Sequence, residues 1–121
     1  MKRYYEHRYN KVSVPFVVQL YEIGDYLSEE DYENVSNFID KIGFTVTVED
    51  ETNDKETGYI GGFRLDDWDM QPIPDSLVLF RDVLSKAVED YVWDNEERIL
   101  EDEKVNRAFD WFYAEREHIM S

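Results

Sequence analysis

Residues 27–50 read LSEEDYENVSNFIDKIGFTVTVED, and this stretch decides the fold because a helical pattern gives way to a strand pattern within it. Ser28 can cap a helix, and three acids follow in the first turn, where the helix dipole favours them. Apolar residues then recur at helical spacing: Val35, Phe38, Ile39 and Ile42. Gly43 is placed to end this helix. Alternating apolar residues after it predict a strand: Phe44, Val46 and Val48.

Two more strand patterns flank this stretch. Upstream, apolar residues alternate over residues 14–20, and Pro15 suits the beginning of a strand or a sheet edge because it lacks an amide donor. Downstream, four alternating residues predict a third strand: Tyr59, Gly61, Phe63 and Leu65. The second and third strands would form an antiparallel hairpin around a polar loop at residues 50–58. The aromatic and basic residues 3–11 could add a fourth strand, with a turn at residues 10–11.

The last third of the chain is predicted to be helical. One apolar face recurs there: Phe80, Val83, Leu84, Ala87, Val88 and Tyr91. After a polar stretch, the same phase continues in a second group: Val105, Phe109 and Phe112. We expect a break or bend within residues 93–97, because this polar stretch offers no face to a core. The predicted fold is α+β in one domain, residues 1–121: a small mixed or antiparallel sheet of about three strands, one helix between the first two, and a C-terminal helical region that is long or broken.

The composition is that of a folded but strongly acidic protein. The 121 residues hold 29 acids and 13 bases, which gives a net charge of −16 and a pI near 4.3. Apolar residues make up 42% and aromatic residues 16%, too much for a disordered acidic tail. Residues 1–15 hold four bases and one acid, so the remainder has nine bases and 28 acids, a net charge of −19. A body of this charge repels nucleic acids and anionic membranes and attracts basic proteins.

The densest acidic tract covers residues 89–103 and contains one base, Arg98. On one continuous helix, four of its acids would form a ridge with a spacing of about 5–6 Å: Asp90, Asp94, Glu97 and Glu101. DNA phosphates are spaced comparably, so this ridge could replace a nucleic-acid backbone in a basic groove. Three neighbouring acids would extend the surface: Glu89, Glu96 and Asp102. The alternative is a solvated helix face with i,i+4 ion pairs to Arg98 and Arg107.

A second acidic group surrounds Trp68. Asp66, Asp67 and Asp69 flank this ring, and tryptophan is a frequent anchor of protein interfaces, so we predict a contact patch for a partner. One alternative is a loop before Pro72 that leads into the next helix. Another is a metal site, since adjacent carboxylates can bind Mg²⁺ or Ca²⁺, but the sequence lacks the further pattern of a metal nuclease.

Several classes of site lack their sequence signature. The chain has no cysteine, and therefore no disulfide and no thiolate metal site. It contains no glycine-rich phosphate loop and no nucleophile elbow. We therefore expect no enzyme activity, no metal and no cofactor. No apolar run approaches the 18 or more residues of a membrane span, so we expect a cytoplasmic protein that does not bind membranes.

These features lead to a hypothesis of function. We expect a non-enzymatic inhibitor that mimics nucleic acid and blocks the basic DNA- or RNA-binding site of a nuclease or other nucleic-acid-binding protein, in the manner of phage anti-restriction or anti-CRISPR proteins. Two alternatives stay open: an immunity or antitoxin-type protein that binds a basic toxin away from its catalytic site, and a structural or adaptor protein whose acidity serves solubility. Free nucleic acid is not an expected ligand, although three tyrosines of the basic N-terminus could stack on bases held by the partner: Tyr4, Tyr5 and Tyr9.

Overall fold

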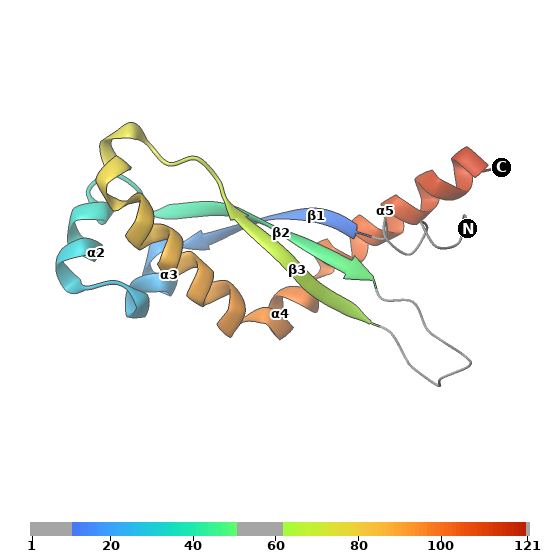
Figure 1. The fold of residues 1–121 in the computed structure, drawn as a ribbon, viewed down its shortest axis with the longest axis horizontal. Helices are drawn as coiled ribbons and strands as arrows, with labels where there is room; N and C mark the ends of the chain where they lie inside the picture. Colours follow the sequence, from blue (N-terminus) through green and yellow to red (C-terminus); the bar gives the residue numbers. More distant parts are fainter. Residues whose placement is uncertain (1–10, 51–61, 121) are drawn as a thin grey trace. The chain divides into compact units, whose positions relative to one another are not determined.

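Three strands and six helical segments make up the described part of the chain. The computed structural model describes residues 11–50 and 62–120, with side chains described as far as residue 114. The α-helices (α), 3-10 helices (η) and strands (β) follow in this order: β1 Lys11–Gln19, η2 Leu20–Tyr26, α2 Glu29–Ser36, β2 Lys41–Asp50, β3 Phe63–Met70, η3 Asp75–Phe80, α3 Arg81–Asp94, α4 Glu96–Leu100 and α5 Glu103–Met120. The strands form one antiparallel sheet in the order β1-β2-β3 (Figure 1). The α+β prediction is confirmed.

The chain divides into two compact units. Unit 1 comprises residues 1–14, 46–67 and 97–121, and unit 2 comprises residues 15–45 and 68–96. All of unit 2 is described, and each of the three strands contributes residues to both units. The single-domain organisation stays a prediction.

The core of unit 2 is centred on Phe44 of β2. This side chain is 2% exposed, and its ring stacks on Phe16 of β1 with the centroids 5.7 Å apart. The edge of Tyr91 of α3 meets the same ring at 6.4 Å, so α3 packs on this face of the sheet. The other buried apolar residues of unit 2 complete this core: Val18, Leu20, Ile23, Val35, Ile42, Leu77, Leu84, Ala87, Val88 and Val92. The apolar face predicted for residues 80–91 is therefore confirmed.

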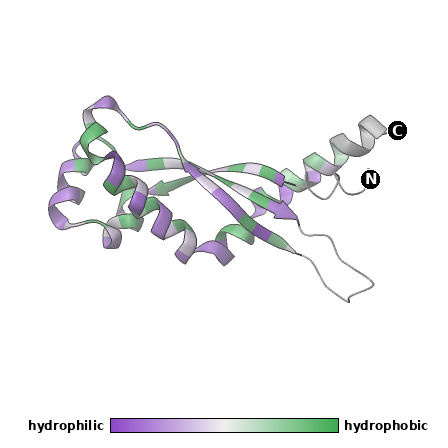
Figure 2. Cartoon of the chain, in the orientation of Figure 1, coloured by the Kyte–Doolittle hydropathy of each residue, from purple (hydrophilic) through white to green (hydrophobic). Residues whose placement is uncertain are grey.

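Unit 1 has its own apolar core between the sheet and α5. Phe63 of β3 stacks on Phe109 of α5 with the ring centroids 4.7 Å apart, and the hydroxyl of Tyr113 donates a hydrogen bond to the carboxylate of Asp50. The fully buried residues of this core are Val14, Val46, Val48, Leu65, Ile99, Val105 and Phe109. Apolar and polar residues alternate along the strands (Figure 2), because successive side chains of a strand point to opposite faces.

The prediction of a helix from the cap at Ser28 to Gly43 is confirmed at its start and wrong at its end. Ser28 caps α2, since its hydroxyl accepts a hydrogen bond from the amide of Asp31 at 3.1 Å. The helix ends at Ser36, and Phe38 is 57% exposed. Ile42 is buried within β2, where its even position matches the inward-facing alternation of that strand. Sheet pairing therefore overrides the helical spacing of the residues after Ser36.

Gly43 lies in β2 and does not end the helix. Its carbonyl accepts a hydrogen bond from the amide of Gln71 at 2.9 Å. A Cβ atom at this position would lie 3.1 Å from Cγ of Gln71, so the Gln71 side chain would have to shift by a few tenths of an ångström to admit one.

The first strand starts and ends earlier than predicted. β1 begins at Lys11, so the turn expected at residues 10–11 does not include Lys11, and the remaining residues of the predicted N-terminal strand lie outside the described residues. The chain leaves β1 after Gln19 and enters η2, a 3-10 helix without a counterpart in the prediction. Its first turn is held by Glu22, whose carboxylate accepts from the amide of Gln19 at 2.8 Å, while Leu20 and Ile23 are buried.

The third strand differs most from its prediction. β3 extends to Met70, so the acidic segment around Trp68 lies in a strand, and the expected loop at this segment is wrong. The predicted start of the strand at residues 59–61 lies outside the described residues. Leu65 is buried, but Asp66 and Asp67 are both exposed, so the alternation shifts by one residue at this point. A shift of this kind is typical of a β-bulge, and it keeps both carboxylates in solvent.

The C-terminal region is broken where the sequence predicts a break. Asn95 has a non-helical conformation, with φ −114° and ψ 22°, and its side-chain amide donates to the carbonyl of Tyr91 at 2.8 Å. A second break follows α4 at residues 101–102, where a carboxylate oxygen of Asp102 accepts from the amide of Lys104 at 2.9 Å. Asp102 therefore caps the start of α5.

Replacing Phe44 with alanine tests the core of unit 2. The loss of the buried ring is expected to lower the free energy of unfolding by about 3–5 kcal/mol. The same substitution at Phe38, which is 57% exposed, is expected to change it by no more than about 0.5 kcal/mol. Urea unfolding followed by circular dichroism measures both variants, and equal losses at the two positions would contradict the packing described above.

Candidate functional site

Most of the negative charge of the described residues belongs to unit 2. This unit holds fourteen acids and three bases, which gives a net charge of −11. The described residues of unit 1 hold eleven acids and six bases, a net charge of −5. No charged side chain is buried among the described residues, so these charges face solvent at least in part.

Few of the carboxylates in unit 2 are neutralised by a base. Its one ion pair among the described residues joins Lys86 to Asp90 along α3, with the nitrogen 3.1 Å from the carboxylate oxygen. Thirteen of the fourteen acids in unit 2 therefore lack an ion pair within the described residues. Uncompensated charges at this density repel one another, and a cationic partner would relieve that repulsion.

The predicted acidic ridge does not form on one helix. Glu89, Asp90 and Asp94 lie on α3, while Glu96 and Glu97 lie on α4. Glu101 and Asp102 lie in the turn before α5. The continuous ridge is wrong because Asn95 interrupts the helix in its middle. The boundary between the units falls after Glu96, so Glu89, Asp90, Asp94 and Glu96 belong to unit 2 and the other three to unit 1.

Residues of η2 lie beside the acids of the predicted tract that belong to α3. The hydroxyl of Tyr26 donates a hydrogen bond to the carboxylate of Asp94 at 2.6 Å, across 68 residues of sequence. This hydrogen bond is the main cause that raises the pKa of Tyr26 to about 12. Partial loss of hydration and the negative charges of Asp94, Asp90 and Asp25 raise it further. The structure thus brings together an acidic cluster that we call the Tyr26 cluster: Asp25, Tyr26, Asp90 and Asp94.

Sequence reasoning missed two parts of this surface. Nothing in the sequence signals the Tyr26 cluster, because it depends on the docking of η2 against α3. The sequence predicts only that three acids of α2 favour the helix dipole: Glu29, Glu30 and Asp31. The structure shows that Glu29, Glu30 and Glu33 of this helix are exposed.

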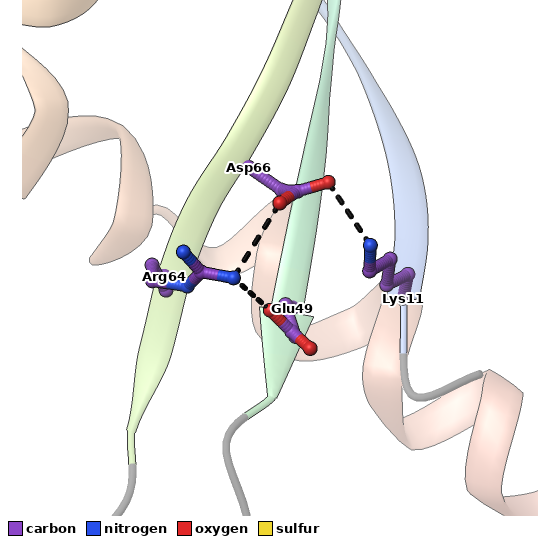
Figure 3. A network of polar contacts seen from close by, with 4 residues as sticks. All are labelled: Lys11, Glu49, Arg64 and Asp66. Carbon is purple, nitrogen blue, oxygen red and sulfur yellow. Dashed lines mark hydrogen bonds and ion pairs between the residues drawn. The ribbon is translucent and has the colours of Figure 1, made fainter. Parts of the chain in front are cut away.

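The acidic group around Trp68 is divided in the structure. Asp66 joins an ion-pair network with residues of all three strands (Figure 3). Its carboxylate lies 3.1 Å from Lys11 of β1 and 3.5 Å from Arg64 of β3, and Arg64 also pairs with Glu49 of β2. Such half-exposed pairs contribute at most about 1 kcal/mol each, but they offset the charge of Asp66. Asp66 and Asp67 belong to unit 1, while Trp68 and Asp69 belong to unit 2.

Trp68 and Asp69 line a groove of about 600 Å³, which we call the Trp68 groove. The end of β3, the segment after it, η3 and the start of α3 form its walls, all within unit 2. Figure 1 shows the path of this segment from β3 through the yellow turn into α3. The groove is a concave feature of unit 2, and the sequence did not predict it.

The described residues offer no arrangement for a metal ion. No group of three or more histidine, cysteine, aspartate or glutamate side chains among them could hold one. Among these residues no helix combines the length and apolar character that a bilayer span requires.

Comparisons with known proteins give no relative. No family model, no curated protein and no solved structure matches the chain.

The titration of Tyr26 tests the Tyr26 cluster. The hydroxyl is expected to ionise near pH 12, and the Asp94→Asn variant should bring its pKa down towards the ordinary 10. Asp69→Asn is the matched control, since Asp69 is not among the charges that raise this pKa. The ¹³Cζ shift of Tyr26 in a pH titration by NMR measures all three proteins.

The same pKa shift has a consequence for stability. Because the folded pKa lies above the unfolded one, the stabilising contribution is fully present below about pH 10. It is lost as the pH rises to about 12, where the Tyr26 hydroxyl of the folded protein ionises as well. A pKa of Tyr26 near the ordinary 10 in the native protein would contradict the contact with Asp94. The same pKa of Tyr26 in the Asp94→Asn and Asp69→Asn variants would contradict it too.

Proposed function

We propose that this protein is a non-enzymatic inhibitor that occupies the basic nucleic-acid-binding site of a nuclease or another nucleic-acid-binding protein. The observation that carries the proposal is the net charge of −11 on unit 2, where one of the fourteen acids has an ion pair within the described part of the chain. An anti-defence role of the phage anti-restriction or anti-CRISPR kind is the biological setting that this chemistry fits.

The acids of unit 2 complement the charge of a nucleic-acid-binding site. Such a site presents lysine and arginine side chains that neutralise phosphates and displace their counterions. A rigid protein surface with many unpaired carboxylates can replace the phosphates and relieve its own repulsion at the same time. Ten of the fourteen acids of unit 2 lie on α2, η2 and α3, and the Tyr26–Asp94 hydrogen bond joins two of these elements.

The proposal places the contact surface on unit 2. Its members are the Tyr26 cluster and the exposed acids of α2, with Glu89 and Glu96 beside them on α3 and α4. The proposed surface does not include the acids of unit 1 in the predicted tract: Glu97, Glu101 and Asp102. The proposal assigns no catalytic step to any residue and takes the cytoplasm as the compartment in which the partner is met.

The first test is competition with nucleic acid. A partner captured from host lysate at low salt should be lost at moderate salt, because each neutralised charge steepens the salt dependence. Pre-loading this partner with DNA or RNA should prevent the complex. A complex that forms equally well on the loaded partner would contradict mimicry and favour an immunity-type protein or an adaptor.

The second test compares two sets of four neutralised acids. The unit 2 set is Glu30→Gln, Glu33→Gln, Glu89→Gln and Asp90→Asn, and the unit 1 set is Glu97→Gln, Glu101→Gln, Glu103→Gln and Asp110→Asn. Each set removes four negative charges and one i,i+4 ion pair, Lys86–Asp90 or Glu103–Arg107.

We expect the unit 2 set to weaken the complex by roughly 100-fold and to reduce its salt dependence, since about four cationic contacts of the partner lose their counter-charge. The unit 1 set should weaken it by less than about threefold, because these acids lie outside the proposed contact surface. Isothermal titration calorimetry at two salt concentrations measures both sets. Equal losses would show that only total charge matters and would contradict a surface on unit 2.

A further inference from the structure

The Trp68 groove combines charge with an aromatic wall. Three of its lining residues are acids, Asp69, Asp75 and Asp82, and one is a base, Arg81. All four are exposed. The lining therefore has two more negative than positive charges, and it belongs to the unit with a net charge of −11.

Trp68 supplies the aromatic wall. The residue lies on β3, is half-buried and lines the groove. The face of an indole ring attracts cations, and arginine is the cation that stacks on it most often. A planar guanidinium can lie on the ring and at the same time donate two hydrogen bonds to a carboxylate, which an ammonium group cannot do with the same geometry.

The remaining lining suits the aliphatic part of an arginine side chain. Met70, Pro72 and Ile73 contribute apolar surface next to the acids. A long cationic side chain buries its methylene groups on apolar surface and keeps its charged end near polar groups. The volume of about 600 Å³ lies within the range of small-ligand pockets, so the groove can hold one such side chain with adjoining backbone.

We propose that the Trp68 groove receives an arginine side chain of the partner protein, with the guanidinium on the indole ring of Trp68 and paired with groove carboxylates. This inference rests on the proposed function, because it names one further contact of unit 2 with the same partner. The groove gives unit 2 a position-specific contact, whereas the acids of α2 and of the Tyr26 cluster act through charge alone.

The test uses a tetra-arginine peptide as the probe. In ¹H–¹⁵N NMR spectra of the whole protein, the peptide should shift the indole N–H of Trp68 and the amide of Ser85 more than the indole N–H of Trp93. Trp93 is the matched reference, since it is 43% exposed on α3 and does not line the groove. A tetra-citrulline peptide, which has the same shape without the charge, should cause no shift.

Variants separate the ring from the charge. Trp68→Leu should weaken peptide binding by about five- to tenfold, the loss expected for one cation–π contact, while Trp68→Tyr should keep most of it. Trp93→Leu should leave the affinity unchanged. The Tyr variant also controls for folding, because it keeps an aromatic ring of similar size in the strand.

Three results would overturn the inference. The first is equal weakening by Trp68→Leu and Trp93→Leu. The second is equal loss in the Leu and Tyr variants at position 68, and the third is binding of spermidine in the groove as tight as that of the arginine peptide. In each case the acidic surface could still compete with nucleic acid, so the proposed function would stand. If competition with nucleic acid fails while the Trp68 shifts and the variant effects hold, the groove stands and mimicry does not.

Discussion

The packing of Tyr91 against Phe44 is the contact on which the acidic surface of unit 2 depends. Phe44 is enclosed by Phe16 and by the edge of Tyr91, and this fixes α3 against the inward face of the strands. With Tyr91 turned to the core, Asp90 remains half-exposed and Asp94 exposed along the same helix. Asp94 is then in place to accept the hydrogen bond from Tyr26. An apolar contact thus decides where the carboxylates are held.

The protein tolerates its charge because the core and the charges are fully separated. The buried residues of the described part are all apolar or aromatic, and no charged side chain among them has lost its contact with water. Solvent screens the repulsion between exposed carboxylates, so folding does not require each of them to find a base. Burial of apolar surface in the two units supplies the stabilisation that opposes the remaining repulsion. A surface with many unpaired acids is compatible with a stable fold for this reason.

The elements that the sequence predicted well are those with one unambiguous periodicity. The face of residues 80–91 and the cap at Ser28 are local features, and the structure confirms both. The break near residue 95 was predictable because polar residues interrupt the apolar face there. Ile42 was assigned to a helix because its spacing from Val35 and Ile39 fits one, but pairing in the sheet placed it in β2. The aspartates at positions 66, 67 and 69 have little intrinsic preference for a strand, and the pairing of β3 with β2 overrides this.

The acidic character of the candidate site could be predicted from the sequence, but the contacts that position its residues could not. The sequence alone determined the net charge, the two apolar helical faces and the acidic tract, because composition and local periodicity fix these. Tertiary structure alone decided that Asp66 pairs with Lys11 and Arg64, and that Tyr26 meets Asp94. It also decided that Trp68 lines a groove. The physical reason is that these contacts join residues up to 68 positions apart, and only the burial of apolar faces against one another brings such residues together.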